Sequence, residues 1–453
     1  MSEQIILQMV TLANTALEKI KSSSLVLAWG LYDLANQFFA LNVVSLYFVR
    51  WITLERGASE IFYSISFGIS TFLVGISAPI LGAISDKLER RRPFLVSFTL
   101  LSIIFTMLLG VPKSIILGLL FFAIANFGCQ LAIVFYNAQM VDIAPKDKIG
   151  LVSGFGRMLG YSGALLALYL IKPIVLNCGY QATFLPTGIL FLIFSLPCML
   201  FIRDKQTKER INPALSTTES YCQIRKGGVN LFSFLRGERI FEIFKDIRAT
   251  FSDVRKLPGL SDFLKATFFG LCAVNAVILF MSVYATKVFG FSESQIINLL
   301  AFSTVFAIAG SMFSGFLSDF LGHKRCLLAT FFLWSICFLA GAFARSIPLY
   351  WLTGALVGTA LGATWVVSRA LVMKLVPAEK IGAVFGLFSL IGYISAITGA
   401  MFWGLALLLL SPFGEWGYRI TLLSLVFFTA TGFIFLLRIP RVPAKSSLWC
   451  RKV

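Results

Sequence analysis

Twelve runs of about 18–25 mostly apolar residues follow one another along this chain, and they constrain its fold more than any other feature. Charged residues make up only 13% of the 453 residues, whereas soluble domains carry about 25%. The sequence therefore predicts an all-α membrane protein with twelve transmembrane helices in a lipid bilayer. The predicted spans are 24–49, 60–83, 94–111, 115–141, 150–171, 182–202, 263–285, 294–317, 326–344, 348–374, 382–410 and 418–437.

The net charge of +18 is distributed unevenly over the segments between these runs. If both termini are cytoplasmic, most of the 39 Lys and Arg residues lie on the cytoplasmic side, and Arg157, Lys265 and Arg369 fall within runs, away from their ends. This positive-inside bias predicts cytoplasmic termini and explains the basic balance without nucleic-acid binding. The short connector and the lack of organelle signals favour a bacterial inner membrane.

Residue types that carry enzyme chemistry are sparse. The eight cysteines are scattered without a CxxC pair, and His323 is the single histidine, so we expect no metal site. The sequence contains no GxxxxGK[ST] loop and no catalytic cluster at the end of any span. We therefore expect a monomeric protein that is not an enzyme, has no cofactor and draws energy from a solute or ion gradient.

The two halves of the chain repeat each other. The segment 145–164, PKDKIGLVSGFGRMLGYSGA, aligns without gaps on 377–396, PAEKIGAVFGLFSLIGYISA, with nine of twenty residues identical. GAISD at 82–86 also aligns on GFLSD at 315–319, at nearly the same offset. Two six-span halves in the same direction are the parallel repeat of major facilitator transporters. The predicted divisions are an N-terminal segment 1–23, bundles 24–202 and 263–437, a cytoplasmic linker 203–262 and a tail 438–453.

The loops after the second and eighth spans are related by this repeat. PILGAISDKLERRRPF and SGFLSDFLGHKRC each place a Gly at the membrane end of a helix, an Asp four residues later, and basic residues beyond. They resemble the cytoplasmic loop motif of the major facilitator superfamily. Asp86 and Asp319 are expected to pair with the basic residues or with a neighbouring helix end, unless these charges only set topology. The predicted cytoplasmic gate comprises Gly82, Asp86, Arg90, Arg91, Gly315, Asp319, Lys324 and Arg325.

Three further stretches point to a narrower family. WGLYDLANQFF, YNAQMVDIAPKDKIGLVSGFGRMLGY and SRALVMKLVPAEKIGAVFGLF resemble the vacuole effluxer family, a major facilitator branch that includes fungal autophagy-linked amino-acid effluxers. The likeness covers the membrane portion of both halves. It differs at Leu271 and Cys272, where the family often has an Asn-Asp pair, and at Arg157, where an apolar or aromatic residue is usual. The resemblance implies a central cavity lined by spans 1, 4, 7 and 10.

Asp33, Arg157 and Arg369 are ionisable residues at similar depths in the inner half of the membrane. A charged group at the bilayer centre costs at least about 2.5–3.5 kcal/mol, so such residues face a bundle interior or a water-filled cavity. Three roles remain open. Asp33 and Arg369 bind the ammonium and carboxylate of a zwitterionic solute, Asp33 loads and releases a proton, or Asp33 forms a fixed ion pair with Arg157 or Arg369.

Several polar residues share the face that the resemblance directs toward the cavity. Equivalent positions of the two halves are expected to build the site, and Asn137 aligns on Arg369. Any single Asn serves equally as a helix–helix hydrogen bond, and Trp365 is either a wall of the site or a lipid-facing residue. The predicted substrate-binding residues are Asp33, Asn36, Asn126, Gln130, Tyr136, Asn137, Asn275, Trp365 and Arg369.

The predicted function is secondary transport of a small polar solute by alternating access, with an amino acid exported and a proton or cation coupled to it. Sugar–cation symporters are the alternative carriers, because YDLAN and RRPF also resemble them. Their second span carries aspartates, whereas ISFGISTFLVGISAPILG has none. A non-transporting receptor, a scaffold or a lipid scramblase on the same fold is the alternative from another class.

Overall fold

The computed structural model describes residues 23–58, 60–145, 147–204 and 257–440. The predicted N-terminal segment, most of the linker and most of the tail lie outside these residues. Helices and short connections make up the described part, which contains no strand. In the first half the helices are Ser23–Glu55, α3 (Glu60–Lys87), α4 (Arg92–Leu108), α5 (Ile115–Ile143), α6 (Ile149–Cys178) and α7 (Phe184–Phe201).

The second half repeats this order with six more helices. They are α11 (Leu260–Phe289), α12 (Glu293–Leu321), α13 (His323–Phe343), α14 (Ile347–Leu375), α15 (Ile381–Leu410) and α16 (Glu415–Arg438). Among the described residues, eleven helices are long and apolar enough to cross a membrane, and α4 is a shorter apolar helix of 17 residues. Each predicted span therefore corresponds to a helix, and the all-α fold is confirmed.

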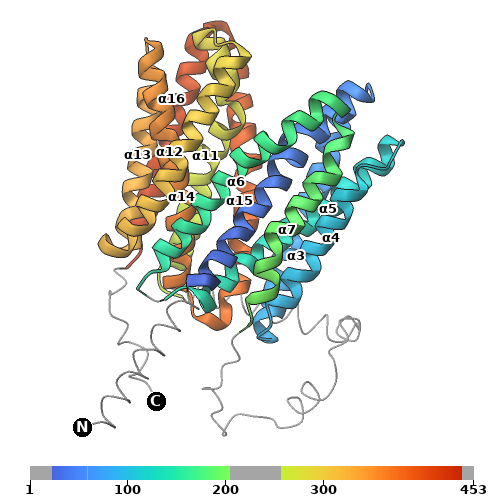
Figure 1. The fold of residues 1–453 in the computed structure, drawn as a ribbon. Coiled ribbons are helices and arrows are strands. Elements are labelled where there is room, and N and C mark those ends of the chain that lie inside the picture. Colours follow the sequence, from blue (N-terminus) through green and yellow to red (C-terminus); the bar gives the residue numbers. More distant parts are fainter. Residues whose placement is uncertain (1–22, 59, 146, 205–256, 441–453) are drawn as a thin grey trace, which may run out of the picture.

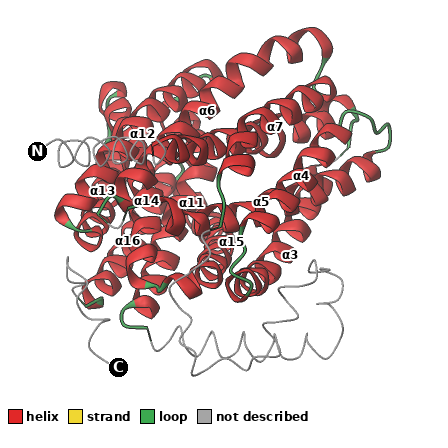
Figure 2. Cartoon of the chain, turned by 60° about the horizontal axis from the view of Figure 1, so that its bottom comes forward, coloured by secondary structure: helices red, strands yellow, loops and turns green. Residues whose placement is uncertain are grey.

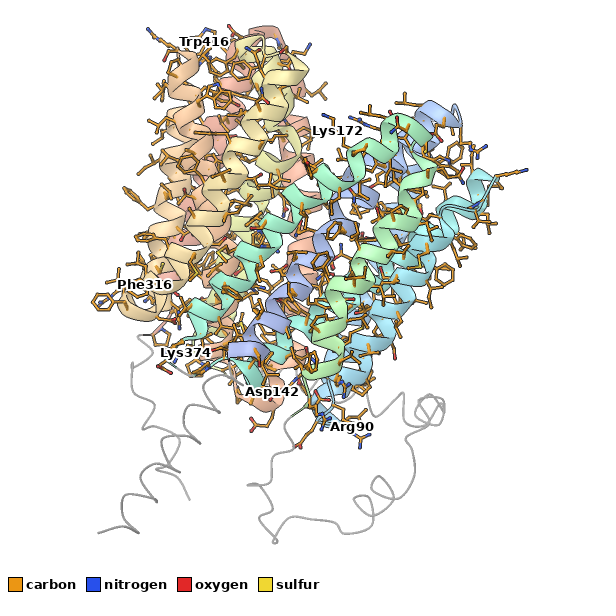
Figure 3. All side chains as sticks on the ribbon, in the orientation of Figure 1. Arg90, Asp142, Lys172, Phe316, Lys374 and Trp416 are labelled. Carbon is orange, nitrogen blue, oxygen red and sulfur yellow. The ribbon has the colours of Figure 1, made fainter. Side chains whose placement is uncertain are left out.

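The two halves form separate bundles that converge at one end. We call this the linker end, because α7 ends there at Phe201 and α11 begins there at Leu260; the opposite end is the far end. Arg90, Asp142 and Lys374 lie at the linker end, and Lys172 and Trp416 at the far end (Figure 3). The bundles diverge toward the far end (Figure 1).

Two seams join the bundles, and the repeat relates them to each other. α6 packs on α12, and α3 packs on α15, as the view turned toward the linker end shows (Figure 2). Glycines allow these helices to approach closely. A Cβ atom added to Gly82 would collide with the carbonyl oxygen of Gly382, and one added to Gly315 would collide with that of Gly150. Small residues at such contacts are what close helix packing in a membrane requires.

Within the second half, α14 presses on α12 along a stripe of three glycines. Cβ atoms added to Gly354, Gly358 and Gly362 would each collide with α12, at Gly358 with the carbonyl oxygen of Ser303 and at Gly362 with that of Ala307. At Gly358 and Gly362 backbone therefore meets backbone, whereas at Gly354 the nearest atoms of α12 belong to the side chains of Leu299 and Ser303.

The turns after α3 and α12 share an uncommon backbone conformation. Glu89 has φ +51°, and Gly322, its counterpart in the repeat, has φ +93°. Both angles lie in the left-handed region that glycine adopts without the steric cost borne by other residues. Among the described residues, Glu89 is the one non-glycine with a positive φ. The first half therefore keeps the turn although its sequence has lost the glycine.

Candidate functional site

A charged cluster lies between the bundles, inside the membrane-spanning region. Asp33, on the first helix, accepts a hydrogen bond through Oδ1 from Nη1 of Arg157 on α6, at 3.2 Å. Its other oxygen, Oδ2, lies 3.6 Å from Nη1 of Arg369 on α14. One carboxylate thus contacts two guanidinium groups, one from each half of the molecule. The three ionisable residues predicted from their depth do meet, and their formal charges sum to one positive charge.

Arg369 crosses the interface and is held by first-half groups. Its Nε donates to Oγ of Ser153 at 3.1 Å and its Nη2 donates to the carbonyl oxygen of Ser153 at 2.8 Å. Its Nη1 donates to Oδ1 of Asn137 at 3.4 Å. The hydroxyl of Ser153 in turn donates to the carbonyl oxygen of Val366, one turn before Arg369 on α14. With 5% of its side chain exposed, Arg369 is a buried link between α14 and the first half.

Arg157 is the more accessible of the two arginines. The side chain of Arg157 is 20% exposed, against 5% for that of Arg369. Its guanidinium carbon lies 5.1 Å from the ring centroid of Tyr161 and 5.5 Å from that of Trp365 on α14. Trp365 therefore faces the interface between the halves. A guanidinium held between two aromatic faces is oriented for planar recognition of a carboxylate.

Aromatic rings from the first helix and α5 pack beneath the cluster. Tyr136 stacks on Trp29 at 4.5 Å and on Tyr32 at 4.9 Å between ring centroids, and Arg369 lies 5.6 Å from the ring centroid of Trp29. The hydroxyl of Tyr136 is buried and has no hydrogen-bond partner among the described residues. Such a group is costly to bury and needs an explanation, so Tyr136 is a candidate contact for an incoming polar group.

An apolar cavity of about 230 Å³ opens beside the cluster. Tyr161 of α6 forms one side, and α11, α12, α13 and α14 supply the rest, including Met281, Leu299, Val357 and Leu361. Tyr161 thus contacts both this cavity and the guanidinium of Arg157.

The remaining predicted binding residues have partners mostly within the first half. Asn126 donates to Oγ of Ser70 on α3 at 2.8 Å, and Asn36 accepts from the thiol of Cys129 at 3.7 Å. These are helix–helix contacts of the kind that the sequence left open. Gln130 differs, because it accepts a hydrogen bond from the Tyr393 hydroxyl of α15, across the interface, at 3.2 Å. Asn275 lies partly buried on α11.

The two loop aspartates bind helix ends in the opposite half. Oδ1 and Oδ2 of Asp86 accept from the backbone N–H groups of Gly382 and Ala383, at 3.0 and 2.9 Å. Those of Asp319 accept from Gly150 and Leu151, both at 2.7 Å. Gly382 and Gly150 lie in the first turns of α15 and α6, where unpaired N–H groups and the helix dipole attract a carboxylate. The geometry matches the expected alternative of a neighbouring helix end.

The basic residues of the predicted gate have different surroundings. Arg91 contacts Asp86 at 3.1 Å and Asp142 at 3.3 Å, and it donates to the carbonyl oxygen of Ala378 across the interface. Lys324 donates to carbonyl oxygens at the end of α16, those of Leu437 and Ile439. Arg90 and Arg325 are exposed.

Sequence reasoning does not identify Ser153, Tyr161 and Tyr393 as site residues. Tyr161 and Tyr393 are identical residues at equivalent positions of the repeat, so the alignment of the two halves already contained a signal for them. Ser153 aligns on Phe385 and carries no such signal. Its role depends on the position of Arg369 in the packed structure.

The family model described as "Vacuole effluxer Atg22 like" matches residues 46–445. An uncharacterized protein of Aquifex aeolicus (strain VF5) is 27% identical over 381 residues, covering 83% of this chain and 88% of the relative. The uncharacterized MFS-type transporter YxiO of Bacillus subtilis (strain 168) is 25% identical over 394 residues, covering 83% and 86%. A multi-drug resistance efflux pump PmrA homolog of Lactococcus lactis subsp. lactis (strain IL1403) is 22% identical over 394 residues, covering 83% of this chain and 86% of the relative.

Solved structures show the same fold. The proton:xylose symporter XylE, of the major facilitator superfamily, superposes with a TM-score of 0.70 at 14% identity, covering 94% of this chain and 98% of that one. The fucose:proton symporter FucP of E. coli superposes with a TM-score of 0.68 at 15% identity, covering 93% and 99%. Likenesses at these identities show the fold alone, and they confirm the predicted major facilitator architecture.

Proposed function

Because this chain belongs to the vacuole effluxer Atg22-like family and is a multi-pass membrane transporter of the major facilitator type, we propose that it exports an amino acid through the space between its two halves. Alternating access at the two ends of the bundles moves the solute. A proton moving the other way drives it. The bacterial relatives support a bacterial inner membrane as its location.

One observation carries the substrate proposal: the partly exposed Arg157 pairs with Asp33 and packs on the ring of Tyr161, which lines the apolar cavity. The substrate carboxylate binds the Arg157 guanidinium. The parallel N–H donors of a guanidinium fit a carboxylate better than the ammonium group of a lysine does. The ammonium group then lies toward Asp33, and the side chain enters the cavity past Tyr161. An apolar cavity next to a charged pair favours amino acids with apolar side chains over sugars, which need many hydrogen-bond partners.

The orientation proposed here places the linker end in the cytoplasm. The excess of Lys and Arg in the segments on that side of the spans supports it. The structure then represents a carrier that is closed toward the cytoplasm by Asp86, Asp319 and Arg369. Substrate leaves toward the far end in this conformation and is loaded after the seams at the linker end separate.

Flux measurements in proteoliposomes test this function. The purified protein is reconstituted, and exchange of radiolabelled amino acids and sugars is measured with and without a proton gradient. We expect exchange of leucine or phenylalanine, a loss of at least tenfold in Arg157→Gln, and partial retention in Arg157→Lys. Leu437→Ala, at the exposed end of α16, is the matched control. Sugar exchange without amino-acid exchange would overturn the proposal in favour of a sugar carrier, and lipid movement alone would favour a scramblase.

A further inference from the structure

The charged cluster between the bundles contains two guanidinium groups, those of Arg157 and Arg369, but only one carboxylate, that of Asp33. We propose that this site also takes apolar monocarboxylates, which are carboxylic acids without an ammonium group, and binds them more tightly than the amino acids they resemble. The inference rests on the proposed function in placing the ligand carboxylate at Arg157 and its apolar group in the cavity beside Tyr161.

Arg157 presents an unused hydrogen-bond donor. Its Nη1 donates to Oδ1 of Asp33 at 3.2 Å, whereas its Nε is buried and has no hydrogen-bond partner among the described residues. A buried donor on a charged group is costly to leave without a partner. Nε and Nη2 form one edge of the guanidinium, and two parallel N–H groups on such an edge bind the two oxygens of a carboxylate. The pairing with Asp33 therefore leaves one edge of Arg157 for a ligand carboxylate.

Tyr161 supplies a second donor, one turn further along α6. The guanidinium carbon of Arg157 lies 5.1 Å from its ring centroid, and the ring also lines the apolar cavity. Its hydroxyl is buried and has no hydrogen-bond partner among the described residues. A phenolic hydroxyl donates one hydrogen bond, and a carboxylate only accepts. One carboxylate at the mouth of the cavity therefore satisfies the Nε of Arg157 and the hydroxyl of Tyr161 together.

Asp33 offers little room to the ammonium group of an amino acid. Its side chain is 4% exposed, and Oδ1 is bonded to Arg157. Oδ2 makes no hydrogen bond, but Nη1 of Arg369 occupies its side at 3.6 Å. The backbone of α6 covers the carboxyl carbon, because a Cβ atom added to Gly160 would lie 3.1 Å from it. An ammonium group therefore reaches Asp33 only by displacing an arginine.

The charge balance of the cluster also favours a ligand with a single negative charge. The formal charges of Asp33, Arg157 and Arg369 sum to one positive charge, which a monocarboxylate neutralises. A zwitterion has no net charge, so the excess positive charge remains when an amino acid binds. Its ammonium group must also leave water beside two arginines, and a buried charge without a partner is unfavourable. Removing the ammonium group from the ligand removes both costs.

The cavity determines which monocarboxylates fit. Its volume of about 230 Å³ is lined by apolar side chains from the second half, including Met281, Leu299 and Leu361. A branched aliphatic or aromatic group finds complementary surroundings there. A second carboxylate or a row of hydroxyl groups loses its hydrogen bonds to water without replacing them. The expected class is therefore apolar monocarboxylates, as distinct from dicarboxylates and sugar acids.

Three molecules with the same apolar group separate the contributions of the two charges. Isocaproate is leucine without its ammonium group, leucinamide has an amide in place of the carboxylate, and leucine carries both charges. Isothermal titration calorimetry on the purified protein in detergent, at neutral pH, measures a dissociation constant for each. We expect isocaproate to bind at least about tenfold more tightly than leucine, and leucinamide to bind more weakly than both.

Two variants remove the two donors independently. Tyr161→Phe loses only a hydroxyl and is expected to weaken isocaproate binding about tenfold, because a hydrogen bond to a charged group is lost. Arg157→Gln is expected to weaken it further. Tyr169→Phe, the same change at an exposed position of α6, is the matched control and is expected to keep the native affinity. Monodisperse elution from size exclusion identifies folded variants, and Tyr161→Phe alone is sufficient for the test.

Asp33→Asn distinguishes the two possible roles of this acid. If the ligand carboxylate binds Arg157 and no ammonium group binds Asp33, the variant removes a neighbouring negative charge and is expected to bind isocaproate more tightly. If Asp33 holds the ammonium group, the same variant binds leucine more weakly and gains nothing for isocaproate. The two ligands measured on one protein preparation therefore give opposite changes in the two cases.

Leucine binding that is as tight as isocaproate binding, or tighter, overturns the proposal. Undetectable isocaproate binding overturns it too, as does isocaproate binding that Tyr161→Phe and Arg157→Gln leave unchanged. Failure of the proposed function is recognised separately, by the absence of amino-acid exchange in proteoliposomes. Isocaproate binding that depends on Arg157 and Tyr161, without amino-acid exchange, supports this inference and leaves amino-acid export without support.

Discussion

Asp86 and Asp319 occupy equivalent positions in the two halves, and each accepts two backbone hydrogen bonds from the first turn of a helix in the opposite half. The four donors, Gly382, Ala383, Gly150 and Leu151, are themselves related by the repeat. The contact closes the linker end twice in the same way. Both contacts use the N–H groups of a helix end, and at Asp86 the side chain of Arg91 adds a charged contact.

Replacing these aspartates is expected to open the linker end. Hydrogen bonds to a charged group contribute about 1.5–3 kcal/mol, so Asp319→Asn should shift the ratio of open to closed molecules by about tenfold or more. Asp86→Asn should have the larger effect, because it also removes the contact with Arg91 at 3.1 Å. Spin labels on cysteines that replace Arg90 and Ala378, which are exposed at the linker end in opposite halves, report both shifts as a change in the distance between the labels. Equal open fractions in native protein and both variants would contradict the role of these carboxylates.

The glycine at the seam between α3 and α15 should not tolerate a methyl group. A Cβ atom on Gly82 would meet the carbonyl oxygen of Gly382, so Gly82→Ala is expected to hold the seam apart and reduce transport at least tenfold. Gly68→Ala, on the same helix, is the matched control, since no atom lies within 4 Å of its added Cβ. Solute flux and label distance are measured for both variants. Normal solute flux in Gly82→Ala would show that α3 and α15 can move apart enough to accommodate the methyl group without loss of transport.

The turn after α3 offers a stabilising substitution. Glu89 is exposed and has φ +51°, a conformation that costs a non-glycine residue about 1 kcal/mol. Glu89→Gly is expected to raise the melting temperature of the detergent-solubilised protein. Arg90→Gly, at the next exposed position, lacks a positive φ to relieve and is expected to lower it by increasing the freedom of the unfolded chain. A lower melting temperature for Glu89→Gly than for the native protein would contradict a steric cost of the positive φ at Glu89.

Filling the apolar cavity should change substrate size preference. Val357 lines the cavity, and Val357→Trp is expected to reduce phenylalanine exchange at least tenfold while glycine or alanine exchange persists. Leu352→Trp, on an exposed position of the same helix, is the control and should leave both rates close to native values. An equal loss for large and small amino acids would place the cavity outside the substrate path.

The fold followed from the sequence because apolar run length and internal repetition are local properties of a chain. The meeting of Asp33, Arg157 and Arg369 was also predictable, since charged residues at equal depth in a membrane have few other partners. The links of Arg369 to Ser153 and Asn137 were not. They depend on the rotation and spacing of α6, α5 and α14, which are set by packing between residues far apart in the chain.

The accessibility of each arginine was likewise beyond the sequence. Arg157 and Arg369 have the same chemistry and similar depth, yet the first is 20% exposed and the second 5%. Neighbouring rings and the seam decide the difference, because Arg369 is enclosed between α14 and the first half. The sequence analysis names Arg369 as the substrate contact, whereas the function proposed above assigns the substrate carboxylate to the more exposed Arg157.

The glycine stripe between α14 and α12 has a kinetic consequence. Arg369 lies on α14 and Asp319 on α12, and these two helices meet backbone to backbone at Gly358 and Gly362. We therefore expect the buried ion pair and the carboxylate at the helix end to disengage in a single concerted step. Opening should follow one exponential with no populated half-open intermediate, and its rate, like its equilibrium, should respond to changes at either residue.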